Sequence, residues 1–468
     1  MDRRVVIVGG GISGLAAARA AVETSQRAGA EMEVVVLERD PAVGGKARTR
    51  RRDGWLVEGG PAGYLDDPDT STTMQRLIAA AGMEGEVIHA SDAARRRFIA
   101  RNGRAREVKP NPLRLVTGGI LSLAGAARLL AEPFVRARAV AEDESVFDFA
   151  ARRIGAQAAE RLVAPMMLGI FAGDARRISL NGAFPRLAAL ERDHGSLVRG
   201  MLARRRESRG GPAGPSGTLT SFRDGMQSLA SGVAARGGFA VRTGTTVHAI
   251  EPAQTGGWLV RAWEQPEPLR ADAVVLACEA WAAADLLAPH APVVATALRG
   301  IVYPTVIAVS LGYGPDSLSS FPRGFGCLIP RGEGIRSLGC VWDSALFAAR
   351  APANHVLVRV LLGGAVDASV DSLSDEEALE TATADVAKLF APGTGPVTRE
   401  VVRWARAIPQ YAVGHPSVVA RVGEGIAQLP GVSIAGNALH GVAFAKAATE
   451  GWRRGEAAAA HAISSARR

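Results

Sequence analysis

The sequence predicts an α/β fold in which separate parts of the chain build one Rossmann-like, dinucleotide-binding sheet. Residues 3–38 read as a strand, the glycine turn "GGGISG", a helix and a second strand. The apolar run "ADAVVLACEA" near residue 275 is typical of a strand buried on both faces. The chain closes with the apolar run "GVSIAG", a glycine loop and a helix, in the same order as at its start. The sheet is therefore expected to be discontinuous in sequence.

Composition narrows the class of protein. At 468 residues, with 47% hydrophobic and 22% charged residues, the chain is expected to form two or three globular domains. Its net charge of +9 comes from arginine, since only four residues are lysine, and two explanations stay open: a GC-rich genome, or an anionic partner such as phospholipid or a carboxylated substrate. Nucleic acid is not expected, because aromatic residues make up 5% and no binding motif is present. The cysteines Cys278, Cys327 and Cys340 lack metal-type spacing and fit a reduced compartment, so no metal site is expected.

The elements along the chain indicate where the domains divide. "TRRRDGWLVEGG" predicts a hairpin with Asp53-Gly54 at its turn, and the region from 71 to 206 is mostly helical in pattern. A loop rich in Gly, Pro and Ser follows, and then short strands come in two series before an acidic helix and the closing strand and helix. We expect a cofactor-binding domain at 1–70, 207–290 and 399–468, a mixed-sheet substrate domain at 71–90 and 291–398, and a helical insert at 91–206.

The most apolar helical stretch is "PLRLVTGGILSLAGAARLLAEPFV". Only 13 uncharged residues lie between Arg114 and Arg128, which is too short to span a bilayer. The stretch is suited instead to lying on a membrane surface. Because the chain enters a strand at once, no targeting segment is predicted. We therefore expect a cytoplasmic location, with the insert peripheral on the cytoplasmic membrane.

The first glycine motif has the spacing G-x-G-x-x-G between a strand and a helix. Gly9 permits the tight turn, Gly11 lets the backbone approach a pyrophosphate, and Gly14 lets the helix pack on the strand. Glu38, 24 residues after Gly14, ends the second strand and can accept hydrogen bonds from ribose hydroxyls. A carboxylate there repels a 2′-phosphate, so NADP is disfavoured.

Two further glycine clusters follow, Gly44-Gly45 and the stretch "EGGPAG" at 58–63. Each is also compatible with a plain turn. Three such clusters within 63 residues favour a long, buried cofactor over a surface-bound NAD.

These motifs and several longer stretches resemble a known family. "GGGISG", "LERDPAVGGKART" and "DGWLVEGGP" are similar to the FAD-binding superfamily of flavin monoamine oxidases and phytoene desaturases. "APMMLGIFAGDARRISLNGAFPRL", "RWARAIPQYAVGH" and "GVSIAGNALHGVAF" are similar, in wording and order, to the protoporphyrinogen oxidase and coproporphyrinogen III oxidase family. The resemblance covers nearly the whole chain, and it departs after the last glycine loop, where this chain reads "AFAKAATEGW".

The resemblance implies an FAD-dependent oxidase in porphyrin and haem biosynthesis. In this family flavin takes hydride from a reduced tetrapyrrole and oxygen reoxidises the flavin, so the protein needs no nucleophile and no metal. Protoporphyrinogen IX is the substrate we expect, and coproporphyrinogen III, which carries extra carboxylates, is the alternative. FAD is expected to be non-covalent, since no Cys or His except His440 falls near the position where the superfamily attaches flavin.

The resemblance also places the cofactor. It implies that the loop from Gly436 to Phe444, including Gly441, lies beside the flavin ring, where a helix start would stabilise negative charge on reduced flavin. Val247 matches a residue at the adenine and Trp404 an aromatic near the flavin, although both also read as core packing. The full set of cofactor residues expected is Gly9, Gly10, Gly11, Ile12, Ser13, Gly14, Glu38, Arg39, Gly45, Lys46, Gly60, Pro61, Ala62, Gly63, Val247, Trp404, Gly436, Val442, Ala443 and Phe444.

For the substrate, the resemblance points to four residues. Arg97 matches an arginine that pairs with a propionate, and a guanidinium suits a bidentate carboxylate contact. A solvated arginine run is the other interpretation of that stretch. Leu328 and Phe347 match apolar residues that sandwich the macrocycle, and Gly169 a glycine whose backbone lies near it. Without the resemblance, Leu328 and Phe347 would be assigned to the core.

Other functions stay open at this point. A flavin amine oxidase or a carotenoid desaturase shares the superfamily but lacks the "RAIPQYAVGH" wording. An escort protein on the same fold, without redox activity, would have lost the glycine clusters, which are intact here. The partners expected are the porphyrinogen, oxygen and a membrane surface, and a homodimer is compatible with the sequence.

Overall fold

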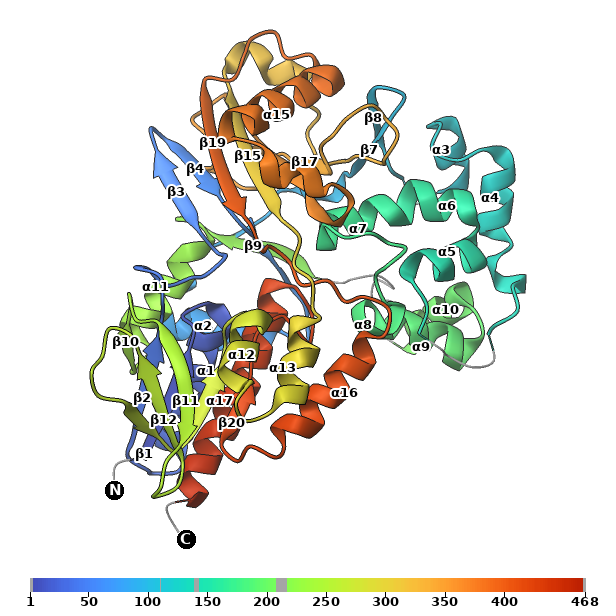
Figure 1. Cartoon of the computed structure of the whole chain (residues 1–468). Coiled ribbons are helices and arrows are strands. Elements are labelled where there is room, and N and C mark those ends of the chain that lie inside the picture. The colour runs from blue at the N-terminus through green and yellow to red at the C-terminus, as the bar shows by residue number, and fades with distance from the viewer. Residues whose placement is uncertain (1–2, 110, 139–142, 208–216, 466–468) are drawn as a thin grey trace.

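The computed structural model describes residues 3–109, 111–138, 143–207 and 217–465, so the predicted Gly/Pro loop at 207–217 lies almost wholly outside the described residues. A parallel five-stranded sheet forms the base of the molecule (Figure 1). Its strands are β1 (Arg3–Val8), β2 (Met32–Leu37), β10 (Ala240–Arg242), β14 (Ala273–Leu276) and β20 (Val432–Ile434), in the order β10-β2-β1-β14-β20. Every residue of β14 is buried, as the continuous apolar run predicts.

Both faces of this sheet are covered. One face packs against helices α1 (Ile12–Arg27) and α17 (Phe444–Ser465), on which α2 (Ser71–Ala81) and α11 (Met226–Arg236) pack in turn. The other packs against α12 (Ala280–Leu287), α13 (Pro292–Arg299), α16 (His415–Ile426) and the antiparallel sheet β11 (Val247–Pro252), β12 (Trp258–Ala262), β13 (Leu269–Ala271).

The first and last helices of the chain, α1 and α17, lie side by side (Figure 1). A Cβ on Gly451 would lie 2.0 Å from the Ser13 carbonyl, and one on Gly455 would lie 2.0 Å from the Ala17 carbonyl. Glycine at these two positions lets the backbones approach. Segments from both ends of the chain therefore pack together on the parallel sheet, as the predicted discontinuous domain requires.

A mixed seven-stranded sheet forms the second body, with α15 (Asp375–Phe390) packed on one face. Its strands are β19 (Thr398–Trp404), β15 (Val306–Tyr313), β18 (Val356–Gly363), β17 (Gly339–Val341), β16 (Gly326–Leu328), β7 (Phe98–Arg101) and β8 (Arg104–Glu107), in this order. The predicted series of strands is confirmed. Ser374 and Glu377 form a capping box at the start of α15, which fixes where this acidic helix begins.

Four segments lie elsewhere than the expected domain limits. Strands β7 and β8, placed in the helical insert, instead pair in the seven-stranded sheet, and β19, placed in the cofactor-binding domain, also belongs there. Helix α13, placed in the substrate domain, packs on the parallel sheet, and α2, also placed there, packs on α1, α11 and α17 beside that sheet. The pairings that place these strands, β7 with β16 and β19 with β15, join segments far apart in sequence, which local patterns do not specify.

The hairpin predicted at Asp53-Gly54 is present as β3 (Thr49–Arg52) and β4 (Trp55–Glu58). Asp53 (φ 51°) and Gly54 (φ 78°) both adopt the left-handed conformation that a two-residue turn of this kind requires. A small sheet, β5 (Tyr64–Asp66), β9 (Thr218–Phe222) and β6 (Val87–His89), lies beside the hairpin and links the two larger bodies.

The helical segment extends to one side of the two sheets (Figure 1). It contains α3 (Pro112–Thr117), α4 (Leu123–Leu130), α5 (Val146–Ile154), α6 (Ala156–Ala158), α7 (Ala164–Phe171), α8 (Leu180–Ala183), α9 (Pro185–His194) and α10 (Leu197–Glu207), with a π-helical turn at Ala159–Val163. Among the described residues, no helix is both long and apolar enough to cross a membrane.

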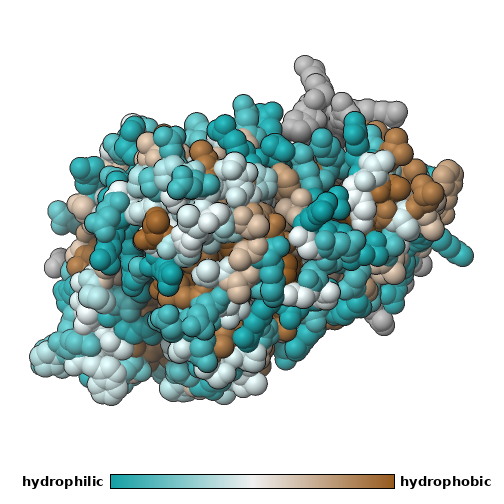
Figure 2. All heavy atoms as spheres, turned by 90° about the horizontal axis from the view of Figure 1, so that it is seen from above, coloured by the Kyte–Doolittle hydropathy of each residue, from teal (hydrophilic) through white to brown (hydrophobic). Residues whose placement is uncertain are grey.

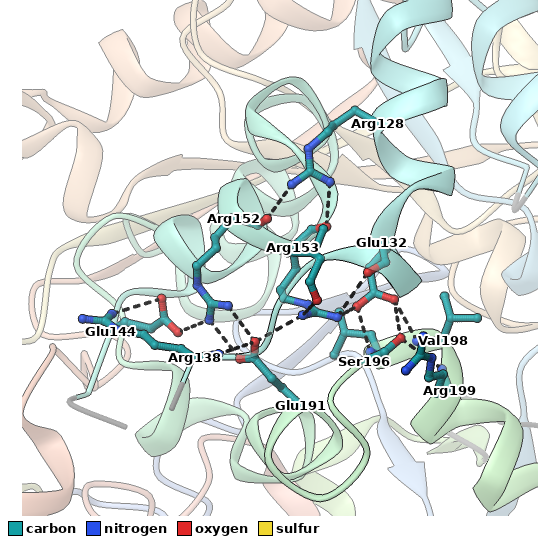
Figure 3. Close-up of polar contacts among 12 residues, drawn as sticks. Arg128, Glu132, Arg138, Glu144, Arg152, Arg153, Glu191, Ser196, Val198 and Arg199 are labelled. Atoms are coloured by element: carbon teal, nitrogen blue, oxygen red, sulfur yellow. Dashed lines mark hydrogen bonds and ion pairs between the residues drawn. The ribbon is translucent and has the colours of Figure 1, made fainter. Parts of the chain in front are cut away.

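Buried ion pairs hold these helices together (Figure 3). The carboxylate of Glu132 pairs with Arg153, and both side chains are almost fully buried. Glu132 also accepts hydrogen bonds from the Ser196 hydroxyl (2.7 Å) and the Leu197 amide (2.8 Å) at the start of α10. Glu191 on α9 accepts from Arg152 (2.6 Å), so the network joins the residues after α4 to α5, α9 and α10.

Candidate functional site

The first glycine motif lies between β1 and α1 and has the geometry that its spacing predicts. A Cβ on Gly9 would lie 2.7 Å from the Ala277 carbonyl, and one on Gly14 would lie 1.9 Å from the Gly9 carbonyl. Both positions therefore exclude any side chain. A Cβ on Gly11 would meet no atom within 4 Å, so this glycine faces open space at the start of the helix. That space, bordered by free helix amides, suits a phosphate group.

Glu38 lies at the end of β2 directly beside this turn. Its carboxylate accepts hydrogen bonds from the amides of Gly10 (2.5 Å) and Asp40 (2.8 Å), and burial raises its pKa. The buried Ser13 hydroxyl has no hydrogen-bond partner among the described residues. Such an unpaired donor at a helix start is suited to a phosphate oxygen. The chemistry of the turn therefore fits a dinucleotide.

The second glycine cluster packs directly on the first. The Gly44 amide donates to the Gly10 carbonyl (2.9 Å), and a Cβ on Gly45 would lie 3.4 Å from the Gly11 Cα. Lys46 continues the cluster and pairs with Glu279 (3.3 Å), which directly precedes α12. The first two predicted clusters thus form one continuous backbone surface.

The third cluster, the Gly59–Gly63 loop, is held from the second sheet. The Trp404 indole donates to the Gly59 carbonyl (2.6 Å), and the Arg359 guanidinium donates to the carbonyls of Gly60 and Glu58. A Cβ on Gly60 would lie 1.9 Å from the Lys46 carbonyl, so the loop lies tightly against the second cluster. Trp404, expected near the cofactor, therefore positions this loop.

Buried charges support the Gly59–Gly63 loop from behind. Arg359 pairs with Asp343 (3.2 Å), and both side chains are buried. Glu58 accepts from the Thr49 hydroxyl (2.7 Å) and the Met226 amide (2.8 Å), while Arg350 lies 3.9 Å away. Burial raises the pKa of Glu58 to about 7. Sequence analysis missed Arg359, although one arginine inside the apolar run "HVLVRVLLGG" was a usable signal.

The C-terminal glycine loop meets the same junction. Gly436 (φ 112°) and Gly441 (φ 78°) both have left-handed backbone conformations. Tyr411 donates to the Asn437 carbonyl (2.6 Å), and His415 donates to the Leu439 carbonyl (3.1 Å). The rings of Tyr411 and His415 stack at 4.0 Å, so two aromatic side chains from the "IPQYAVGH" stretch hold this loop in place.

The start of α17 adds the remaining predicted residues of this loop. The Phe444 ring lies 6.3 Å from that of Tyr64, which directly follows Gly63. Val442 packs against the apolar cluster that contains Tyr411. The start of α17 therefore reaches Tyr64, beside the Gly59–Gly63 loop.

The remaining cofactor predictions lie around this junction. Val247 opens β11, two residues after Thr245, whose amide donates to the Glu38 carbonyl (2.8 Å). The Arg39 guanidinium lies 5.8 Å from the Trp281 ring. The Ala62 carbonyl accepts from the Ser221 hydroxyl (2.8 Å), which fixes the loop that also holds Pro61.

The predicted substrate residues fall on the second sheet and the helical segment. The Phe347 ring would lie 3.1 Å from a Cβ on Gly63, so a predicted substrate residue meets the predicted cofactor loop. Leu328 would lie 2.7 Å from a Cβ on Gly169, so β16 and α7 are in close contact. Arg97 is exposed, and its guanidinium lies 5.7 Å from the Phe325 ring. It forms no ion pair within the described part of the chain.

A parallel dinucleotide-binding sheet, glycine loops from both chain ends and an apposed mixed sheet together define a dinucleotide-dependent oxidoreductase. Comparison with known proteins makes this class more specific. The chain belongs to the family described as flavin containing amine oxidoreductase, whose model matches residues 12–461.

Among curated proteins, the chain is 30% identical over 464 residues to Protoporphyrinogen oxidase 1, chloroplastic, of Arabidopsis thaliana, covering 94% of this chain and 85% of the plant protein. It is 29% identical to Coproporphyrinogen III oxidase of Bacillus subtilis (strain 168), covering 94% of each. These relatives confirm the resemblance.

Solved structures share the fold. A crystal structure from Exiguobacterium sp. 255-15 superposes with a TM-score of 0.82 at 24% identity, covering 98% of this chain and 99% of that chain. Cyclohexylamine Oxidase from Brevibacterium oxydans IH-35A superposes with a TM-score of 0.68 at 19% identity, covering 100% of both chains. The fold is therefore the mixed α/β fold of the flavin-dependent amine oxidases.

Proposed function

We propose that the chain is an FAD-dependent oxidase that converts a porphyrinogen into its porphyrin, with oxygen as the electron acceptor. Protoporphyrinogen IX is the substrate expected from the sequence, and coproporphyrinogen III is the alternative. One observation supports the proposal most: Phe347, from the substrate side, meets Gly63 of the glycine loops. The relatives named for both oxidases support it independently.

The proposed roles follow from the geometry. When bound, FAD accepts hydride from the substrate and passes the electrons on to oxygen. The amides and hydroxyl near Ser13 would hold its phosphates, and Glu38 would accept from a ribose hydroxyl. The helix start at Phe444 contributes positive partial charge to the flavin side of the junction.

The substrate side supplies position and surface. Leu328 and Phe347 provide apolar walls, and the exposed Arg97 provides a guanidinium for a propionate. The set contains no protein nucleophile, in agreement with a reaction in which this chain only positions the reactants. We propose that FAD is non-covalently bound.

The test is to purify the protein and supply each porphyrinogen under air. We expect a yellow protein that releases free FAD on denaturation and converts at least one porphyrinogen faster than the uncatalysed reaction, as measured by porphyrin fluorescence. A protein that binds FAD but oxidises neither porphyrinogen would refute the proposed substrate class. A protein that takes up no flavin would refute the whole proposal and favour an escort protein.

We also propose that this protein is cytoplasmic and that its helical segment rests on the cytoplasmic membrane. Exposed apolar side chains gather on α3, α4 and the turn that follows, at the right end of the molecule in Figure 2. They are Leu113 (68% exposed), Leu123 (76%), Leu130 (63%) and Phe134 (85%). A cluster of this kind, with arginines nearby, suits the surface of an anionic bilayer.

A further inference from the structure

A cavity of about 80 Å³ lies between the second sheet and the helical segment, next to the predicted substrate residues. Ile99 and Arg101 of β7 line one wall, and Arg331 and Glu333, from the chain after β16, line another. Arg161, in the π-helical turn before α7, closes the cavity from the helical side. Three guanidinium groups therefore meet around one small space.

Two of these guanidinium groups have no carboxylate partner in the described part of the chain. Glu333 accepts from Arg101 (2.7 Å) and from the Asn102 amide (2.7 Å), so this carboxylate is already engaged. Arg161 donates to the Ile120 carbonyl (3.0 Å), and Arg331 donates to the Arg336 carbonyl (3.1 Å).

The second carboxylate that lines the cavity also forms no ion pair with Arg161 or Arg331 among the described residues. Glu160 pairs instead with Arg176 (2.7 Å), outside the cavity lining. Burial and the nearby charge of Arg101 lower the pKa of Arg161, which is the expected effect of crowding like charges. An anion in the cavity would relieve that repulsion.

Strand register places this cavity on the same face as the substrate residues. Ile99 pairs with Leu328, so their side chains point to the same side of the sheet, toward Gly169 on α7. The ladder between β7 and β8 continues through Arg97, whose carbonyl accepts from the Val108 amide. Alternation along the strand then puts Arg97, Ile99 and Arg101 on one face, with the two arginines about 13 Å apart.

We infer that Arg101, Arg161 and Arg331 form a second carboxylate subsite, which takes a propionate on the substrate edge opposite to the edge docked at Arg97. The half-buried Leu328 side chain lies between the two basic poles and contacts the macrocycle, and the buried Ile99 lies behind it. Coproporphyrinogen III carries a propionate on every pyrrole ring and engages both poles. Protoporphyrinogen IX carries propionates on one edge only and engages one. The inference rests on the proposed function and favours the tetracarboxylate substrate.

The test uses the FAD-loaded full chain and the double variant Arg161→Gln/Arg331→Gln. The ratio of KM for coproporphyrinogen III to KM for protoporphyrinogen IX is expected to rise about tenfold or more, because charge-assisted hydrogen bonds to the extra carboxylates are lost. Binding of the product, coproporphyrin III, measured by fluorescence titration without turnover, should weaken by a similar factor. The variant Arg161→Lys/Arg331→Lys should recover part of that binding.

The matched control is Arg52→Gln, which removes a charge from a side chain that is 88% exposed on the β3–β4 hairpin and should leave the KM ratio unchanged. An unchanged ratio in the double variant, or an equal loss for both substrates, overturns the subsite. A wild-type protein that oxidises protoporphyrinogen IX and does not bind coproporphyrin III also overturns it, but leaves the proposed function intact. Failure to oxidise any porphyrinogen refutes the proposed function itself.

Discussion

At the scale of single residues, Arg359 connects the seven-stranded sheet to the Gly59–Gly63 loop. Its guanidinium comes from β18, pairs with the buried Asp343 and donates to the carbonyls of Glu58 and Gly60. It therefore sets the position of a loop that we assign to the cofactor. Neither the glycine motif nor the resemblance indicates this role.

We expect Arg359→Gln to weaken FAD binding about tenfold, which corresponds to about 1.4 kcal/mol, since one charge-assisted contact to the loop is lost. The measurement is flavin fluorescence titration of the apoprotein, and Arg359→Lys should fall between wild type and Arg359→Gln. Arg192→Gln, at a side chain 71% exposed on α9, is the control. Equal affinities of wild type and Arg359→Gln would show that the loop holds its position without the guanidinium.

Glu58 gives a second residue-scale prediction, on pH. Burial raises its folded-state pKa to about 7 from 4.5, so between these pH values the folded state retains a proton that the unfolded chain has lost. Stability should therefore fall as pH rises through this window and level off above it, by a total on the order of 3 kcal/mol. Glu58→Gln removes this contribution. Urea denaturation from pH 4 to 8 should give a flatter profile for the variant, and parallel profiles would contradict the assignment.

At the scale of secondary-structure elements, the buried ion pairs of Figure 3 hold the helical segment together. Glu132 is the central acceptor, since Arg153, Ser196 and the start of α10 all donate to it. Its pKa is lowered: burial alone would raise it, but the hydrogen bond from Arg153 and those from α10 outweigh burial. These polar contacts add to the apolar clusters that also join the helices of this segment.

Glu132→Ala leaves the Arg153 guanidinium buried without its main partner and should lower the free energy of unfolding by about 3–5 kcal/mol. The measurement is urea denaturation at pH 7. Glu456→Gln breaks the exposed pair with Arg27 and should cost less than about 1 kcal/mol. Similar small losses for the two variants would show that the network contributes little to stability.

At the scale of the whole molecule, the helical segment presents its exposed apolar side chains away from the two sheets (Figures 1 and 2). Complete burial of an apolar side chain of this size is worth about 1.5–3 kcal/mol, which is the upper bound for its insertion into a bilayer interface. We expect the protein to co-sediment with vesicles of phosphatidylcholine and phosphatidylglycerol. Phe134→Asp should reduce the bound fraction at least about tenfold, whereas Val397→Asp, at another exposed apolar position, should not. Loss of binding in both variants, or none in either, would refute this surface.

The sequence by itself determined the parallel sheet, the hairpin turn and the glycine loops. Local rules suffice there: Gly9 and Gly14 allow no side chain because backbone lies against them, and the apolar run of β14 is buried on both sides. The strand-glycine-helix order at both ends of the chain also followed from local patterns, and α1 and α17 pack side by side. The resemblance then directed attention to Phe347 and Trp404, which bare periodicity assigns to the core.

Only the tertiary structure decided that the β7–β8 hairpin joins β16 and that β19 pairs with β15, because short strands carry no signal for a partner far away in sequence. The same holds for Arg359 at the cofactor loop and for Arg161 beside Arg101 and Arg331. In the sequence these are arginines among 55 basic residues. Burial and mutual distance give each its role, and both arise only when separate elements pack against each other.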